Sequence, residues 1–211
     1  MMNINYCNLC DSCILGRDDS NEYQEIHITI DSDEKKASEF ESICKTKGGK
    51  VISIQLATMP EKSEIQTMSS ISFKGNRKDA YDVVQDVVST CQQKNIPVTR
   101  VKLECSIFHS DFKGEKGYFE GHLAVDIDDT MVYMLREVAV NCHAHCSRNA
   151  FKKNVYMVTL RHDGSKIDFE KSMKVLKDSI DKKWKVIKDI REFCYYDSNR
   201  SLDSNWTSNL I

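Results

Sequence analysis

Two short segments of the sequence carry the same set of side chains that can transfer protons. Residues 23–31 read Tyr-Gln-Glu-Ile-His-Ile-Thr-Ile-Asp, and residues 118–126 read Tyr-Phe-Glu-Gly-His-Leu-Ala-Val-Asp. In both segments a glutamate lies two positions before a histidine. Imidazole changes charge near neutral pH and is the commonest general acid or base in enzymes. His27 and His122 are therefore the first candidates for catalytic residues.

Both segments alternate between apolar and polar residues, which predicts β-strands. Ile26 and Ile28 point to one face of the first strand, while Glu25, His27 and Thr29 point to the other. A strand with one apolar face belongs to a sheet that helices cover on a single side. We therefore expect the polar side chains of both strands to stand on open sheet faces.

The rest of the chain predicts the elements that hold these strands. After the first strand we expect a helix capped by Ser32 or Asp33, and after the second a helix capped by Asp128 or Asp129. Asn76 is expected to cap a further helix. The other predicted elements are a strand at 51–56, a polar loop at 57–75 of which a part is a strand, a strand at 98–105, an insertion at 142–149, a strand at 155–161, a helix through 169–184 and a strand at 186–195.

This order predicts an α+β fold, in which a ferredoxin-like split βαβ module is duplicated in tandem. Helices would cover one face of each sheet, and the open polar faces would form a common cleft. The predicted organisation is a Cys-rich N-terminal tail (1–21), a first repeat (22–108), a linker (109–117), a second repeat (118–197) and a C-terminal tail (198–211).

Composition limits the class of protein. Hydrophobic residues make up 40% of the 211 residues, and a net charge of −2 gives no overall attraction to nucleic acid or membranes, although a local basic patch stays open. No apolar run is long enough to span a bilayer, and the N-terminus lacks a secretory signal. Of nine cysteines, Cys44, Cys91 and Cys105 fall on apolar phases, which predicts buried thiols, a reducing compartment and a cytoplasmic location.

Two further segments offer metal ligands. Cys7, Cys10 and Cys13 are spaced so that their thiolates can reach one soft metal, although a fourth ligand is missing and a tail with free or acylated cysteines is the alternative. In the insertion, His143 and His145 would face one way if that segment were a strand. A loop there would instead bring Arg148 to an anion. We expect no resident cofactor.

The polar phases of the predicted strands also contain cations. Lys102 and Arg161 would stand on the same faces as the Glu25/His27 and Glu120/His122 pairs. Arginine suits phosphate because it binds through two parallel hydrogen bonds, and lysine adds a point charge. The alternative is that each Glu/His pair only stabilises a half-exposed sheet, as cross-strand pairs often do.

The two histidine motifs resemble those of the 2H phosphoesterases, the superfamily of RNA ligase-like and cyclic phosphodiesterase enzymes. His27-Ile28-Thr29 and His122-Leu123-Ala124 are similar to the family's paired His-x-Thr/Ser motifs, with Ala124 departing from the pattern. The resemblance implies two lobes around a groove, with His27 and His122 as general base and general acid and Thr29 on the phosphate. The second half, at 145–149, 159–161 and 196–199, also resembles a group of bacterial proteins without an established activity.

These observations lead to three hypotheses about function. The first is a phosphoesterase-like enzyme acting on a nucleotide or RNA-end phosphodiester by acid–base catalysis through His27 and His122. The substrate-binding residues would be Thr29, Glu25, Glu120, Lys102, Arg148 and Arg161. The second is a non-catalytic module that binds a nucleotide, RNA or protein, and the third is a metal-dependent enzyme that uses Glu25, His27, Glu120 and His122.

Overall fold

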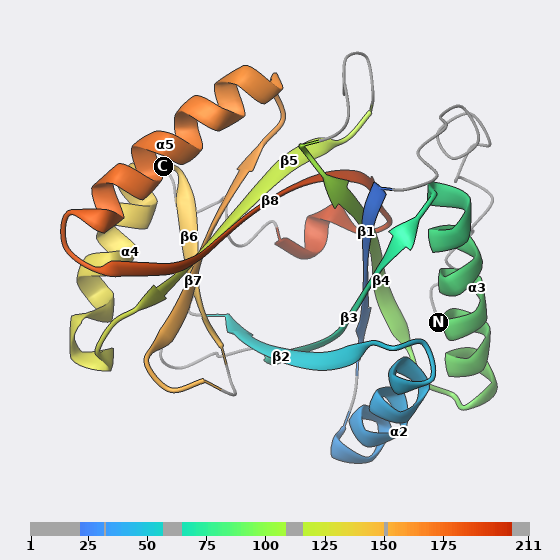
Figure 1. The fold of residues 1–211 in the computed structure, drawn as a ribbon. Helices are drawn as coiled ribbons and strands as arrows, with labels where there is room; N and C mark the ends of the chain where they lie inside the picture. The colour runs from blue at the N-terminus through green and yellow to red at the C-terminus, as the bar shows by residue number, and fades with distance from the viewer. Residues whose placement is uncertain (1–21, 32, 57–64, 109–115, 150–151, 204–211) are drawn as a thin grey trace. The chain divides into compact units, whose positions relative to one another are not determined.

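A computed structural model describes residues 22–31, 33–56, 65–108, 116–149 and 152–203 (Figure 1). Within these residues two sets of elements follow one another in the same order. The first set is β1 (Glu22–Ile30), α2 (Glu34–Lys45), β2 (Lys50–Leu56), β3 (Ile65–Gly75), α3 (Arg77–Gln93) and β4 (Val98–Ser106). The second set is β5 (Tyr118–Asp126), η2 (Asp129–Met131) with α4 (Val132–Asn141), β6 (Ala144–Asn149), β7 (Val155–His162), α5 (Lys166–Asp181) and β8 (Lys185–Asp197), and the short helix η3 (Arg200–Asp203) follows.

Both sets have the strand order of a ferredoxin-like fold. The order is β4-β1-β3-β2 in the first set and β8-β5-β7-β6 in the second, so the opening strand is always in the middle beside the last strand. β1 is antiparallel to both β3 and β4, and β5 is antiparallel to β7. The predicted α+β, ferredoxin-like class is confirmed at this level.

Two segments for which the sequence leaves both loop and strand open form complete strands. Residues 65–75 form β3, the central partner of β1, although their many serines and threonines suggested a polar loop with only part of it in a strand. Residues 144–149 form β6, so the predicted insertion is the counterpart of β2. In both segments pairing with a neighbouring strand outweighs weak local propensity. The positive φ of His143, 55°, makes the turn that leads from α4 into β6.

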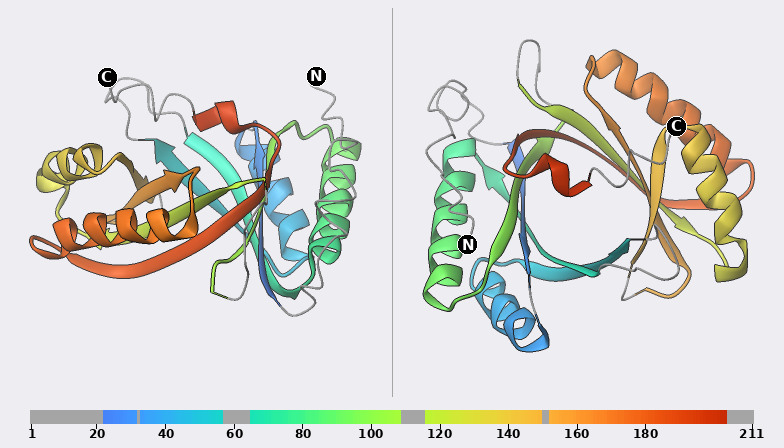
Figure 2. Two further views of the ribbon diagram at one scale, coloured as in Figure 1. Left: turned by 90° about the horizontal axis from the view of Figure 1, so that it is seen from above. Right: turned by 180° about the vertical axis from the view of Figure 1, so that it is seen from behind.

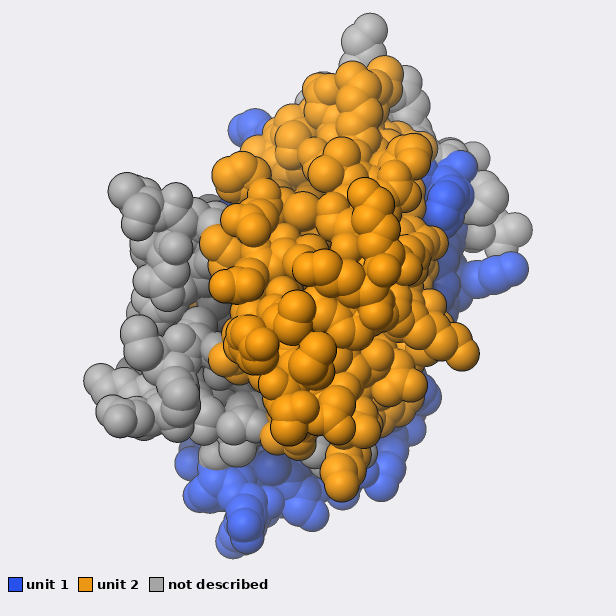
Figure 3. Space-filling model, turned by 90° about the vertical axis from the view of Figure 1, so that its left-hand side faces the viewer, with its two compact units in different colours: residues 1–52, 66–117, 194–200 blue, residues 53–65, 118–193, 201–211 orange. Residues whose placement is uncertain are grey.

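The chain divides into two compact units (Figure 3). Unit 1 contains residues 1–52, 66–117 and 194–200, and unit 2 contains residues 53–65, 118–193 and 201–211. The predicted repeats are continuous segments, whereas β2 and β8 each contribute residues to both units. The predicted cleft between the two polar faces stays a prediction.

Side-chain caps fix the starts of the helices as the sequence predicts. Asp33 accepts a hydrogen bond from the Lys36 backbone and begins α2. Asn76 begins α3 in a reciprocal capping box with Asp79. Asp128 caps the short helix η2 that leads into α4. No helix among the described residues is long and apolar enough to cross a membrane.

In each unit the helices cover the apolar face of the sheet. In unit 2, α4 and α5 lie side by side over one face of the sheet (Figures 1 and 2), and α5 contacts β5 and β7. In unit 1, α3 packs on β1 and β4. Ile26 and Ile28 are completely buried on this side, as the alternation predicts. The thiols of Cys44 and Cys91 are buried as well, and burial raises their pKa values to about 12 and about 11.

Most side chains of the polar faces are buried, which corrects the prediction of open faces, although the side chain of His122 is 20% exposed. Thr29 is 3% exposed, Lys102 6% and Glu120 1%. Buried charges are costly unless they are paired. Arg100 is an example of a buried charge that is paired, because it donates to both carboxylate oxygens of Asp197 at 2.9 and 2.6 Å. This pair joins β4 to the end of β8 within unit 1.

Gly121 lets α5 approach the middle of β5 closely. It lies between Glu120 and His122 but points to the helix face, and a Cβ at this position would collide with the sulfur and methyl groups of Met173. Ile26 is the equivalent residue of β1 and fills this space with its own side chain. Gly121 therefore fixes where the Glu120/His122 segment lies relative to α5.

We expect Gly121→Ala to destabilise the protein by about 1–3 kcal/mol, because the added methyl group must displace the buried Met173. Urea unfolding followed by circular dichroism measures this change. In a Met173→Ala background, Gly121→Ala should reduce the free energy of unfolding by less than it does in the wild type. Equal costs of Gly121→Ala in both backgrounds would show that Met173 is not the obstacle.

Candidate functional site

His27 joins three strands of unit 1. Its Nδ1 lies 2.8 Å from the Ser69 carbonyl oxygen, and its Nε2 lies 3.1 Å from Glu104 and 3.7 Å from Glu25. The β1–β3 pairing omits His27 and Ile28, and the Ser69 hydroxyl there accepts the Ile28 backbone N–H at 2.9 Å. At this point the Ser69 hydroxyl serves Ile28 in place of a backbone carbonyl, and the Ser69 carbonyl oxygen contacts the ring of His27.

These contacts determine the protonation state of His27. A carbonyl oxygen only accepts, so Nδ1 must carry a proton. Nε2 also needs a proton, because otherwise its lone pair would face the carboxylate of Glu104. Burial lowers the pKa of His27, but the hydrogen bond and charge of Glu104, with the charge of Glu25, outweigh burial and the nearby Lys102 cation, and the pKa is raised above its ordinary value.

The groups around His27 also have charged or hydrogen-bonding neighbours on several strands. Lys102 lies 2.9 Å from Glu104, and Glu25 accepts hydrogen bonds from Tyr23 at 2.6 Å and Ser70 at 2.7 Å. The arrangement uses both ring nitrogens of His27 and leaves neither available to a substrate. We therefore infer that His27 has a structural role, as the clamp that joins β1, β3 and β4.

His122 has different partners in unit 2. Its Nδ1 lies 2.9 Å from the Thr159 hydroxyl, and its Nε2 lies 3.8 Å from both Glu120 and Glu192. A hydroxyl can donate or accept, so His122 can keep this hydrogen bond in either protonation state. At 3.8 Å the carboxylates are too far for direct hydrogen bonds. Proton exchange is therefore compatible with the geometry of His122.

A second histidine lies in the same row of unit 2. Thr159 of β7 is directly opposite His122 of β5, and it is also directly opposite His145 of β6. Residues opposite one another in adjacent strands point to the same face. The row therefore runs His122, Thr159, His145 across three strands, with the hydroxyl between the two imidazoles.

Arg161 lies on the same face as this row, two residues after Thr159 on β7. It donates to Glu120 at 2.9 Å, and its guanidinium lies 4.3 Å from the centre of the Tyr118 ring. The ion pair and the ring hold the cation in a fixed orientation. The predicted grouping of Glu120, His122 and Arg161 is therefore present in unit 2.

The structure does not bring Arg148 to this face. Side chains of a strand alternate, and Arg148 points to the helix side of β6, where it pairs with Asp129 at 3.1 Å. Tyr156 donates to the same carboxylate at 2.8 Å, and burial and the contact with Asp129 raise the pKa of Tyr156 to about 12. The expected phosphate contact from Arg148 would therefore need this pair to break and the side chain to change faces.

The other predicted residues divide between the units. Glu25, His27, Thr29 and Lys102 share the polar face of unit 1. The Thr29 hydroxyl is buried, and none of the described residues forms a hydrogen bond with it. Glu192 was not anticipated as a site residue, because the weak repeat of the last strands hid its correspondence to Glu104. The sequence offers a strand at His145 as one alternative, but it does not show that this strand places His145 opposite Thr159.

The predicted metal ligands receive no support. Cys7, Cys10 and Cys13 lie outside the described residues. Among the described residues, no three His, Cys, Asp or Glu side chains converge as ligands of one metal ion.

Comparisons with known proteins do not identify an activity. No protein-family model matches the sequence, and no curated protein is significantly similar to it. The regulatory subunit of aspartate kinase from Thermus thermophilus is similar over 75% of this chain and 93% of its own, with 11% identity and a TM-score of 0.37. Chlorite dismutase from Candidatus Nitrospira defluvii is similar over 90% and 95%, with 8% identity and a TM-score of 0.31. These similarities are too remote to support an argument about function.

The charged state of His27 predicts how stability depends on pH. A histidine with a raised folded pKa stabilises the fold fully below its unfolded pKa, and this contribution disappears as pH rises through the folded pKa. As pH rises from the ordinary histidine pKa of about 6.5 through the raised folded pKa, we expect a loss of about 1.4 kcal/mol for each unit between the two pKa values. Urea unfolding at several pH values measures it, and His27→Gln should remove this part of the pH dependence.

A titration of the folded protein provides the control for this prediction. The His27 imidazole resonances, followed by NMR in the wild type, should titrate at a pH above the ordinary value for histidine. A midpoint below that value would contradict the assignment of a doubly protonated, clamped ring.

Proposed function

We propose that the protein is a phosphoesterase-like enzyme that binds the phosphodiester of a nucleotide or RNA end on the polar face of the unit 2 sheet. The observation that carries the proposal is the row of His122, Thr159 and His145. Adjacent strands are about 4.8 Å apart, so the backbones at the two histidines are roughly 10 Å apart. This separation is of the order that a phosphate in contact with two imidazoles requires.

The roles follow from the contacts. In the hydrolysis of a cyclic phosphodiester, one neutral imidazole takes a proton from the attacking water, and the other, protonated, gives a proton to the leaving ribose oxygen. His122 and His145 are the proposed pair, which moves the second histidine from the expected His27 to the same unit as His122. The Thr159 hydroxyl and the fixed charge of Arg161 would contact the phosphate.

The carboxylates beside His122 support its role without touching the substrate. Glu120 is neutralised by Arg161, so its charge does not repel a phosphate fully. Glu192 lies on the Nε2 side of the ring, opposite the nitrogen that faces Thr159. A carboxylate in this place orients an imidazole and stabilises it when it takes up a proton.

Binding without catalysis is the second candidate, and one observation favours it. In unit 1 the equivalent histidine, His27, is engaged at both nitrogens and serves the fold. The duplicated motif can therefore be retained for structural reasons. The same face of unit 2 would then hold a nucleotide or RNA end without turning it over.

We expect hydrolysis of 2′,3′-cyclic nucleotides by the wild type, and losses in kcat of about 10²–10⁴-fold in His122→Gln and His145→Gln, because each change removes one proton-transfer group. Product formation is measured by chromatography across a range of pH. Each variant should also lose one limb of the pH–rate profile, which a change that only disturbs folding would not produce.

His143→Asn is the matched control, because it removes a histidine from the turn beside β6 while asparagine tolerates the positive φ. Its activity should equal that of the wild type. Saturable nucleotide binding without turnover by any variant would favour the binding module. Neither binding nor turnover by the wild type would reject both candidates.

A further inference from the structure

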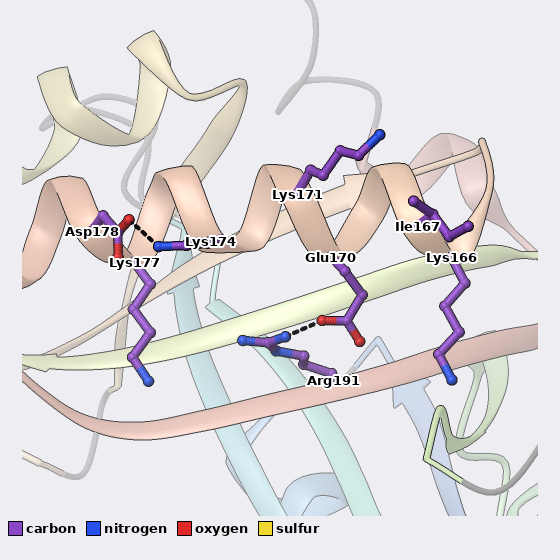
Figure 4. A pocket seen from close by; sticks show the side chains of 8 residues that line it. All are labelled: Lys166, Ile167, Glu170, Lys171, Lys174, Lys177, Asp178 and Arg191. Carbon is purple, nitrogen blue, oxygen red and sulfur yellow. Dashed lines mark hydrogen bonds and ion pairs between the residues drawn. The ribbon is translucent and has the colours of Figure 1, made fainter.

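A basic groove runs along α5 on the helix side of unit 2. It lies between α5 and β8, and Figure 4 shows the side chains that line it. Lys166 and Lys177 lie at the two ends of the groove and project toward β8. Glu170 pairs with Arg191 between them. Ile167 also lines the groove and is 68% exposed. Cations therefore dominate an open surface that also offers an apolar contact.

The charge of this region differs in sign from that of the whole chain. Residues 166–191 contain nine Lys and Arg against five Asp and Glu, whereas the complete sequence has 30 against 32. A local excess of positive charge on a neutral or acidic protein attracts anions to one surface. The local basic patch that the net charge left open is therefore located on α5 and β8.

Two lysines of the groove form exposed ion pairs, whereas Arg191 is 19% exposed and is bound by both Glu170 and Asp189. Lys174 pairs with Asp178 at 2.6 Å and Lys177 pairs with Asp189 at 3.0 Å, but their side chains are 74% and 38% exposed. Exposed ion pairs contribute little and are screened by salt. Phosphate groups can therefore replace the carboxylates at low cost.

The spacing of the cations favours a linear polyanion. Lys166 and Lys177 are eleven residues apart on one helix, so at 1.5 Å per residue the groove is about 16 Å long. This length spans several consecutive phosphates of a nucleic acid strand. Trp184, beneath the Lys183 ammonium at the end of α5, and Ile167 offer apolar surfaces to unpaired bases.

We propose that the α5–β8 groove binds single-stranded nucleic acid through its phosphate backbone. The surface is separate from the His122 face, because Arg191 points to α5 whereas the next residue, Glu192, points to His122. The inference therefore does not depend on the proposed catalytic function.

Fluorescence anisotropy with a labelled single-stranded oligouridylate at low salt tests the proposal on the full chain. Lys174→Glu/Lys177→Glu should weaken binding at least tenfold and reduce the slope of log K against log salt by about 1.4, because two phosphate contacts are lost. The matched control is Lys45→Glu/Lys78→Glu, which makes the same change in net charge and breaks exposed ion pairs on α2 and α3 of unit 1. Its affinity should remain within about twofold of wild type.

Three outcomes would overturn the proposal. The first is the absence of saturable binding at low salt, and the second is an equal loss in the control variant, which would indicate attraction by net charge alone. The third is displacement of the oligonucleotide by polyglutamate as effectively as by unlabelled oligouridylate, which would indicate an acidic peptide site. The anisotropy assay measures binding and not turnover, so a failure of catalysis leaves this test intact.

Discussion

The burial of charged side chains on the polar face of each sheet is the constraint on which this structure depends. Alternation along β1 and β5 commits one side of each strand to the helices, and the other side then carries glutamates, histidines and cations that are mostly removed from water. Removing one partner of a buried pair leaves the other charge uncompensated, at a cost of about 3–5 kcal/mol. The pairs that hold the strands together are therefore the same groups that sequence reasoning assigned to chemistry.

The two units resolve this constraint in different ways. In unit 1 a backbone carbonyl fixes one proton on His27 and the carboxylate of Glu104 fixes the other. In unit 2 a hydroxyl takes the place of the carbonyl, and the carboxylates are farther away. A group that can either donate or accept permits the ring to change its protonation state, whereas a group that only accepts does not. The oxygen atom beside Nδ1 therefore distinguishes the two histidines. It is a carbonyl at His27, which keeps the proton on the ring, and a hydroxyl at His122, which permits the ring to gain or lose one.

The sheet of unit 2 presents two surfaces of different character. On one side the His122 row is compact, its glutamates are buried, and three adjacent strands hold the geometry in place. On the other side the α5–β8 groove is exposed, and the ion pair of Lys174 with Asp178 stands in solvent. Rigid, partly buried groups suit chemistry on one bond, whereas mobile exposed lysines suit the nonspecific binding of a chain of phosphates. Consecutive residues of β8 serve the two surfaces because side chains of a strand alternate.

The sequence by itself determined the α+β class, a cap for α2 at Ser32 or Asp33, the cap at Asn76, the apolar phases of β1 and β5 and the grouping of Glu120, His122 and Arg161. These features depend on local periodicity and on residues a few positions apart, which are visible in a single chain. Only the tertiary structure decided that 65–75 and 144–149 are strands, that Arg148 faces the helices, that His27 is clamped by Ser69 and Glu104, and that His145 lies across Thr159 from His122. Strand pairing joins residues that are distant in sequence, and a shift of one residue in register would send each of these side chains to the opposite face.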